Sequence, residues 1–310
     1  ATQQANDSKS LDHHVNNATA TNHSRASSKR KRNPADDLIC PITLELPLDP
    51  VMAADGRVYE REAIMQHFDS SINQAKSPFT NKVLGTKQVI DATQHRNTIE
   101  TLIENNMIVG ELAKTWKEKK QENAALLAKA EAGDVEAIEK VAFNYFWKVN
   151  GFRPNSSECY KWCKRLQELD NPKGIAYIGV IHLYGLPASI PIDTKRGLDY
   201  IQEAANRFSN LGAYEFAKVL SIEHAKYGVE ENEGDACMFL EEAIREPCQH
   251  DHIPTHDHIP PHYKQKARVL LENLARKIGW WDIVSEAAGD SDDGDGPGLF
   301  VQRVHTQAGN

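Results

Sequence analysis

Disulfide pairs, long apolar runs and zinc-ligand pairs are lacking in this sequence of 310 residues. Its five cysteines are odd in number and scattered, which does not fit a disulfide framework and favours a reducing compartment, the cytoplasm or the nucleus. No apolar run approaches the ~20 residues of a membrane-spanning helix, and residues 1–10 lack the apolar core of a secretory signal. The chain begins with Ala rather than Met, so an upstream segment is left open.

An excess of positive charge is also lacking. The formal net charge of -8 argues against a general nucleic-acid coat protein. Residues 1–33 depart from this balance, because they hold six Lys or Arg and two Asp; we expect them to form a disordered basic arm. The basic run Lys29–Arg32 is either a nuclear localisation signal or part of a solvated basic tail. Residues 286–310, rich in Gly and Asp at their start, are predicted to be a disordered acidic tail.

Between these ends, residues 34–107 predict a small module of loops, a hairpin and two helices. Asp55-Gly56 lies between β-formers and predicts a hairpin with a type I′ turn. Apolar residues at helical spacing predict one helix over 60–68 and a second from about residue 94. Asp91 or Thr93 is expected to cap the second helix with its side chain.

A domain of about 70 residues has a marginal core and often needs a disulfide or a bound metal for stability. Zinc is the obvious metal, but a two-zinc RING finger needs eight Cys or His ligands. Residues 34–107 offer only Cys40, His67 and His95, which excludes such a site by ligand count. Polar networks and packing must therefore hold its loops, and Cys40 is interpreted as a small buried hydrophobe rather than a catalytic nucleophile.

Several separated motifs in this module closely resemble the U-box, a family that keeps the RING shape without zinc. They are Ile39–Leu46, Asp49–Val51, Gly56–Arg61 and Ser77–Thr80. U-box proteins are ubiquitin ligases that bind a ubiquitin-conjugating enzyme and bring it to a substrate. The resemblance implies a RING-like α+β fold, with no cofactor, no metal and no covalent intermediate on this chain.

The resemblance also implies which residues contact the conjugating enzyme. Ile42 and Leu44 on the first loop and Pro78 on the second would form a shallow apolar patch, although Ile42 or Leu44 in the core is the alternative. Asn81 stands where many family members have Arg or Lys, and Lys82 follows it. Asn donates a hydrogen bond without the charge-assisted strength of Arg, so catalytic stimulation, as distinct from binding, is left open.

Residues 132–285 are predicted to be an α-solenoid with a C-terminal capping helix. Asn155, Asp193 and Asn232 begin similar segments 38 and 39 residues apart, each followed by a small residue and an aromatic one. Each unit reads as two short helices that bury their faces only by stacking. The pattern resembles Sel-1-like repeats, relatives of tetratricopeptide repeats, and this implies a substrate or adaptor on the concave face. A helix from about Tyr263 to Trp281 is predicted to be the cap.

The predicted fold is thus mainly α, a zinc-free RING-like U-box followed by helical repeats. Residues 108–131 form a linker helix that either docks on the first repeat or makes a dimer. The histidines from His250 to His262 are interpreted as a loop, and Cys159 and Cys163 share a helix face but two ligands alone do not make a site. Besides a ubiquitin ligase, a non-catalytic scaffold with a degenerate U-box and a nuclear assembly factor are left open.

Overall fold

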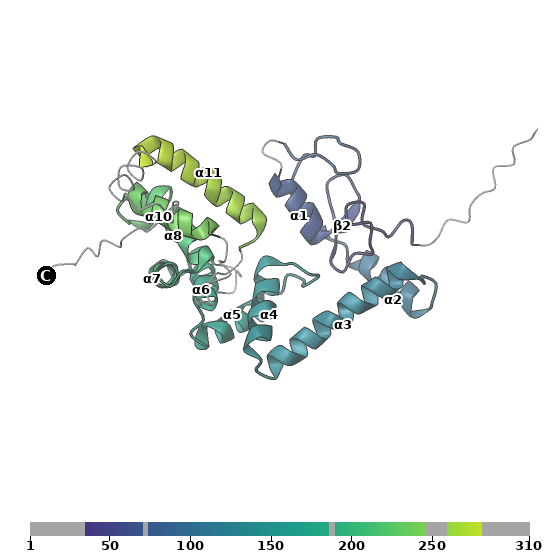
Figure 1. The fold of residues 1–310 in the computed structure, drawn as a ribbon. Coiled ribbons are helices and arrows are strands. Elements are labelled where there is room, and N and C mark those ends of the chain that lie inside the picture. The colour runs from purple at the N-terminus through teal and green to yellow at the C-terminus, as the bar shows by residue number, and fades with distance from the viewer. Residues whose placement is uncertain (1–34, 71–73, 186–189, 246–258, 281–310) are drawn as a thin grey trace, which may run out of the picture. The chain divides into compact units, whose positions relative to one another are not determined.

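The computed structural model describes residues 35–70, 74–185, 190–245 and 259–280, all within one compact unit (Figure 1). The predicted basic arm, the acidic tail and most of the histidine-rich stretch lie outside the described residues. Within the described ranges, no helix is both long enough and apolar enough to cross a membrane.

The first module contains a small antiparallel sheet and two helices. Its elements are β1 (Pro50–Met52), β2 (Val58–Glu60), α1 (Arg61–Ser70), β3 (Ile90–Asp91) and α2 (Thr93–Glu104). The strand order is β2-β1-β3, with Val51 opposite Tyr59 on one side and opposite Asp91 on the other. Tyr59 and Ile64 are fully buried, and they place the β2–α1 junction in the core.

Two local predictions in this module are wrong. The hairpin is present, but only Gly56 of the pair Asp55-Gly56 has a positive φ, at +75°. The amide of Gly56 donates to the carbonyl of Ala53 at 3.0 Å, which fits a type I turn followed by a left-handed glycine rather than a type I′ turn. The N-cap of α2 is Ala92, without a side-chain hydrogen bond, so neither Asp91 nor Thr93 caps it.

The linker helix α3 (Glu111–Glu131) takes part in two cores. Near its start, Trp116 is buried in one cluster with Ile99 and Ile103 of α2, and its Nε1 donates to the carbonyl of Pro47 at 3.4 Å. Near its end, Leu126 packs against the core of the repeats. The helix therefore docks on the first module as well as on the first repeat.

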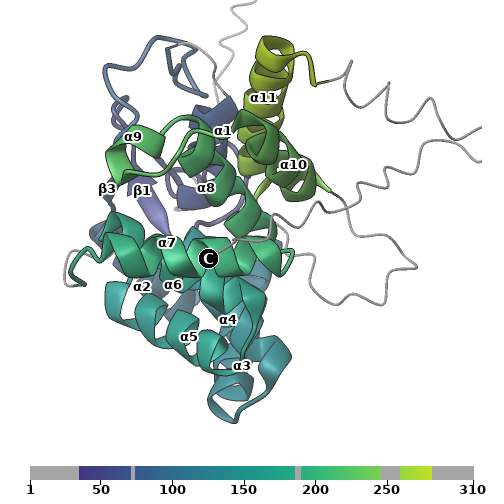
Figure 2. The same ribbon diagram turned by 90° about the vertical axis from the view of Figure 1, so that its left-hand side faces the viewer.

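The remaining helices follow one another along the chain and pack on their sequence neighbours (Figure 1 and Figure 2). They are α4 (Val135–Trp147), α5 (Ser156–Glu168), α6 (Pro172–Tyr184), α7 (Thr194–Asn206), α8 (Asn210–Ser221), α9 (His224–Tyr227), α10 (Glu233–Ile244) and α11 (Pro261–Ile278). In α11, Leu271 and Leu274 are buried in one cluster with residues of α8 and α10.

The residues that mark the sequence period start helices. The side chains of Asn155, Asp193 and Asn232 are the N-caps of α5, α7 and α10, and each accepts a hydrogen bond from an amide of the first helical turn. Such a cap satisfies a backbone donor that the helix itself leaves unpaired. The period of 38 and 39 residues is therefore a period of helix starts.

Two glycines lie where helices touch. A Cβ on Gly197 of α7 would lie 2.7 Å from the backbone nitrogen of Leu183 in α6, and one on Gly212 of α8 would lie 2.7 Å from that of Ala205 in α7. These contacts leave no room for a side chain. Glycine at these two positions therefore lets neighbouring helices approach closely.

Candidate functional site

The residues predicted to contact a conjugating enzyme lie on two loops of the first module, the first loop (39–48) and the second loop (74–89). Leu44 is 70% exposed and Ile42 is 36% exposed, so neither side chain belongs to the core. Pro78 is half-buried, and Asn81 and Lys82 are exposed. We call these two loops together the two-loop face.

Two further apolar side chains of this face, Phe79 and Val83, were not predicted from the sequence. Phe79 is 54% exposed and Val83 is 55% exposed. The guanidinium of Arg57, on the hairpin, lies 3.4 Å from the centre of the Phe79 ring, a cation–π contact. The signal for Phe79 was present, because an aromatic residue inside a short polar loop has few neighbours to bury it.

Two residues of the face hold an unusual backbone conformation. Leu44 has a φ of +58° and Asn81 a φ of +56°. The left-handed region suits Asn but costs a residue such as Leu ~1–2 kcal/mol. Hydrogen bonds between Cys40 and its loop partners hold Leu44 there: the Leu44 amide donates to the Cys40 carbonyl, and the Cys40 amide donates to the Glu45 carbonyl, both at 2.9 Å. Strain that is tolerated at an exposed apolar residue is typical of functional positions.

Asp55 connects the hairpin to the second loop. Its Oδ2 accepts hydrogen bonds from the hydroxyl groups of Ser77, at 2.5 Å, and Tyr59, at 2.7 Å. Its Oδ1 accepts the amide of Arg57 at 3.0 Å. The hydroxyl oxygen of Ser77 in turn accepts the amide of Thr80 at 3.0 Å. One carboxylate thus fixes the loop that carries Pro78.

The pKa values of Asp55 and Tyr59 follow from their burial and from these hydrogen bonds. Burial raises the pKa of Asp55, but the hydrogen bonds from Ser77, Tyr59 and Arg57 together outweigh it, so the pKa lies below its usual value. Burial, and next the hydrogen bond to Asp55, raise the pKa of Tyr59 to about 12. At neutral pH the carboxylate is therefore an acceptor and the phenol a donor, as the hydrogen bonds require.

Asp49 is the centre of a second polar group. It is 1% exposed, and its carboxylate accepts Nε of Arg61 at 2.5 Å and Nη2 of Arg96 at 2.7 Å. Arg61 also pairs with Asp91. These contacts join the start of β1 to α1, α2 and β3. Asp91, which does not cap α2, thus has a structural role in this polar group.

Glu60 and Cys40 attach the first loop to the end of β2. The Glu60 carboxylate accepts the amides of Leu48, at 2.7 Å, and Asp49, at 3.2 Å. Burial raises the pKa of Glu60 more than these two hydrogen bonds lower it. The Cys40 sulfur is buried and accepts the Glu60 amide at 3.2 Å. Cys40 is therefore a structural side chain, as predicted.

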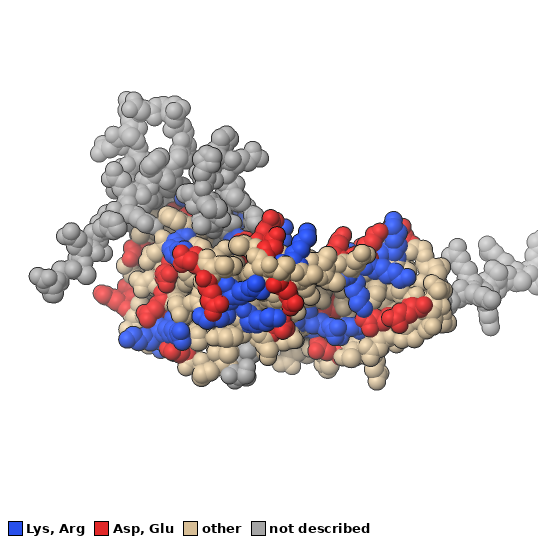
Figure 3. Space-filling view, turned by 90° about the horizontal axis from the view of Figure 1, so that it is seen from below, with Lys and Arg blue, Asp and Glu red and all other residues tan. Residues whose placement is uncertain are grey.

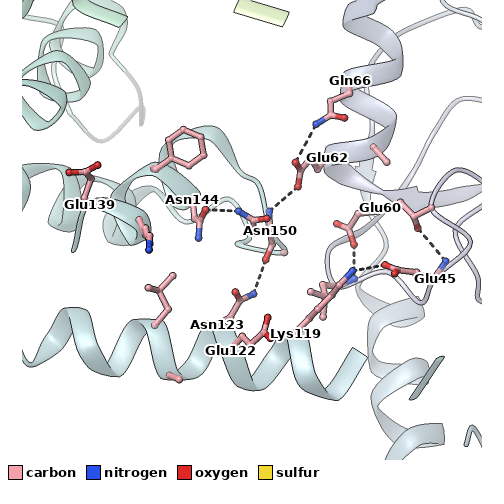
Figure 4. A pocket seen from close by; sticks show the side chains of 18 of the residues that line it. Glu45, Glu60, Glu62, Gln66, Lys119, Glu122, Asn123, Glu139, Asn144 and Asn150 are labelled. Atoms are coloured by element: carbon pink, nitrogen blue, oxygen red, sulfur yellow. Dashed lines mark hydrogen bonds and ion pairs between the residues drawn. The ribbon is translucent and has the colours of Figure 1, made fainter. Parts of the chain in front are cut away.

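A cleft of about 1080 Å³ opens beside the first loop (Figure 4). The polar side chains in it mostly bind one another. Asn123 of α3 donates to the carbonyl of Asn150 at 2.7 Å, the amide of Asn150 donates to Glu62 of α1 at 2.9 Å, and Lys119 pairs with Glu45 at 2.5 Å. The charged side chains on the face in Figure 3 are likewise of mixed sign, which creates no single-sign field.

Comparison with known proteins identifies the first module as a U-box. The family model described as "U-box domain" matches residues 35–108. The chain is 35% identical over 74 residues to U-box domain-containing protein 18 of Arabidopsis thaliana, covering 24% of this chain and 10% of the relative. It is 32% identical over 82 residues to a probable bifunctional E2/E3 enzyme of Acanthamoeba polyphaga mimivirus, covering 26% and 6%.

The chain thus matches only 10% and 6% of the lengths of these two relatives. A solved Sel1 repeat protein from Oxalobacter formigenes overlaps 47% of this chain and 39% of its own, with 20% identity and a TM-score of 0.30. In the described part of residues 132–280, helices pair with their neighbours, several begin at side-chain N-caps and some touch at glycines, as helical repeats do.

Proposed function

We propose that this chain is a U-box type ubiquitin-protein ligase. A ubiquitin-conjugating enzyme binds the two-loop face, and its ubiquitin passes to a lysine of a substrate. One observation carries the proposal: Ile42, Leu44 and Phe79 are exposed apolar side chains on loops that buried polar groups hold in place. A small domain that orders apolar side chains in solvent is presenting an interaction surface.

The transfer needs no nucleophile from this chain. The amine of the substrate lysine attacks the thioester carbonyl on the conjugating enzyme, a C–N bond forms, and the C–S bond breaks with release of the thiol. The U-box contributes proximity and a restrained geometry of the thioester. Cys40 takes no part, because its buried sulfur accepts the Glu60 amide.

Asn81 sets the strength of this stimulation. It is exposed in the middle of the second loop, where its side-chain amide can donate one neutral hydrogen bond to the bound enzyme or its ubiquitin. A guanidinium at this place would make charge-assisted, bidentate bonds. This position is also the observation that favours the second candidate, a scaffold whose U-box docks a partner without stimulating transfer. The repeats hold the substrate or adaptor in either case.

Self-ubiquitination by the full chain, with a panel of conjugating enzymes, tests the proposal. We expect chains with at least one enzyme and a loss of ~10-fold or more for Leu44→Ala or Pro78→Ala, as is usual for central interface residues. Val135→Ala is the matched control, because Val135 is a half-exposed apolar residue on α4, outside the two-loop face. If the wild-type chain is silent with every enzyme yet still binds one of them, the scaffold is the better description.

A further inference from the structure

Two thiols of the first repeat lie in contact on one helix. Cys159 and Cys163 occupy successive turns of α5, and their sulfur atoms are 4.0 Å apart (α5 in Figure 2). Cys163 is fully buried among the core residues of the repeats, whereas Cys159 is half-buried. The pair therefore has one sulfur inside the core and one that solvent reaches.

The spacing suits a bridging atom better than a disulfide. A disulfide would bring the sulfurs to ~2.05 Å, although both side chains leave the same face of one helix. Two metal–sulfur bonds of the ~2.3 Å found for zinc thiolates span ~3.8 Å at a tetrahedral angle and ~4.6 Å in a line. The observed 4.0 Å is far closer to these spans than to a disulfide bond, and a two-ligand ion, which holds its ligands in a line, needs the sulfurs to move apart by only ~0.6 Å.

Burial gives the two sulfurs different roles. Solvent reaches the half-buried Cys159, so this sulfur is the first to meet an incoming ion. Cys163 lies beside it in the core, so the inner sulfur completes the bridge.

The number of ligands selects the ion. In the described part of the chain, no group of three or more His, Cys, Asp and Glu side chains is placed to hold a metal, so this pair lacks the four ligands of zinc. Thiolates select soft ions, and among the common metals of the cell Cu(I) is stable with two ligands. We propose that Cys159 and Cys163 form a two-thiolate binding site for Cu(I).

Binding is a ligand exchange without electron transfer. Cu(I) leaves its carrier or chelator, two Cu–S bonds form, and the protons still on the two thiols pass to solvent. Because Cys163 lies in the core with Trp162 and Leu166, an ion that bridges the two turns also stabilises α5 against unfolding. This inference does not depend on the proposed ligase activity.

Competition with a Cu(I) chelator tests the site. Under anaerobic conditions with ascorbate, the full-length chain should withdraw one equivalent of Cu(I) from its bicinchoninate complex. Cys159→Ser and Cys163→Ala should each weaken this withdrawal ~10-fold or more, since each removes half of the ligands. Cys237→Ser is the control, because Cys237 is a buried thiol on α10 with no partner cysteine near it among the described residues.

X-ray absorption of the copper-loaded chain should show two sulfur neighbours and no nitrogen neighbour. Equal withdrawal by the wild-type chain and Cys159→Ser would overturn the proposal, as would displacement of the bound copper by an excess of Zn(II). Should Cys163→Ala fail to fold by circular dichroism, Cys159→Ser decides alone, because its half-buried position tolerates the change.

Discussion

The U-box and the repeats are stabilised by different kinds of interaction. In the U-box, short strands and long loops are joined by buried ions and hydrogen bonds, with Asp49, Asp55 and Arg96 at the centres. In the repeats, apolar side chains and glycines such as Gly197 pack helix against helix. Loops have no regular backbone bonds and need directional partners, whereas helices satisfy their own backbone and need only complementary shapes.

The largest test of this contrast is Asp49→Ala. The change leaves Arg96 without its carboxylate partner and Arg61 with only Asp91, and the side chain that both pairs lose is 2% exposed. Breaking a buried ion pair on one side typically costs ~3–5 kcal/mol, so we expect the U-box to unfold first. Hydrogen exchange of α1 and α2 amides measures the loss. Glu45→Gln is the control, because the exposed pair of Glu45 with Lys119 is worth less than ~1 kcal/mol.

The corresponding test in the repeats is Gly197→Ala. The added methyl group would meet the backbone of Leu183, which cannot move aside, and overpacking of this kind costs ~1–3 kcal/mol. Gly234→Ala is the matched control on α10, because the nearest atom to its new Cβ is 3.7 Å away and alanine favours the helix by ~1 kcal/mol. The midpoint temperature of thermal unfolding should therefore fall for Gly197→Ala and rise for Gly234→Ala.

A smaller effect is expected at the strained residue of the first loop. Leu44→Gly removes the left-handed strain and should stabilise the U-box by ~1 kcal/mol. The same change removes an exposed apolar side chain of the two-loop face, so self-ubiquitination should fall. Denaturant titration and the transfer assay are compared on one preparation. A variant that gained stability and kept full activity would show that the strain serves no binding role.

The smallest expected effect is the contribution of Asp55 to the pH dependence of the unfolding free energy. Its pKa is lower in the folded chain than the usual 3.8, so the unfolded chain binds the proton more readily. The contribution to stability is complete above pH 3.8 and is lost as the pH falls through the lower folded value. Asp55→Asn should flatten this part of the curve of unfolding free energy against pH. Glu60, whose pKa is raised, contributes with the opposite sign.

The same contrast explains what could be predicted. The N-caps at Asn155, Asp193 and Asn232 and the glycines at helix contacts are local or periodic features, so a single sequence reveals them. The partner of Asp49 on α2 lies 47 residues away, and no local pattern selects Arg96 for it. Asp91 failed as a cap because Arg61 engages its carboxylate, a tertiary contact that overrides a local preference.

At the candidate site too, features with a local or family pattern could be predicted, and tertiary contacts could not. Exposure of Ile42 and Leu44 was expected from the family pattern, while the stacking of Arg57 on Phe79 joins a hairpin and a loop that are separate in the sequence. The turn at Gly56 was predicted with the wrong type, because the Asp-Gly pair is compatible with more than one hairpin geometry and loop length decides between them.

Trp116 has a practical consequence for anyone who excises the U-box. The family match ends at residue 108, yet this indole, eight positions further on, covers Ile99 and Ile103 and bonds the carbonyl of Pro47. A recombinant fragment that ends with the match would expose the apolar surface around Ile99 and Ile103 and precipitate. A fragment extended through the first turns of α3 would keep Trp116 and cover that surface.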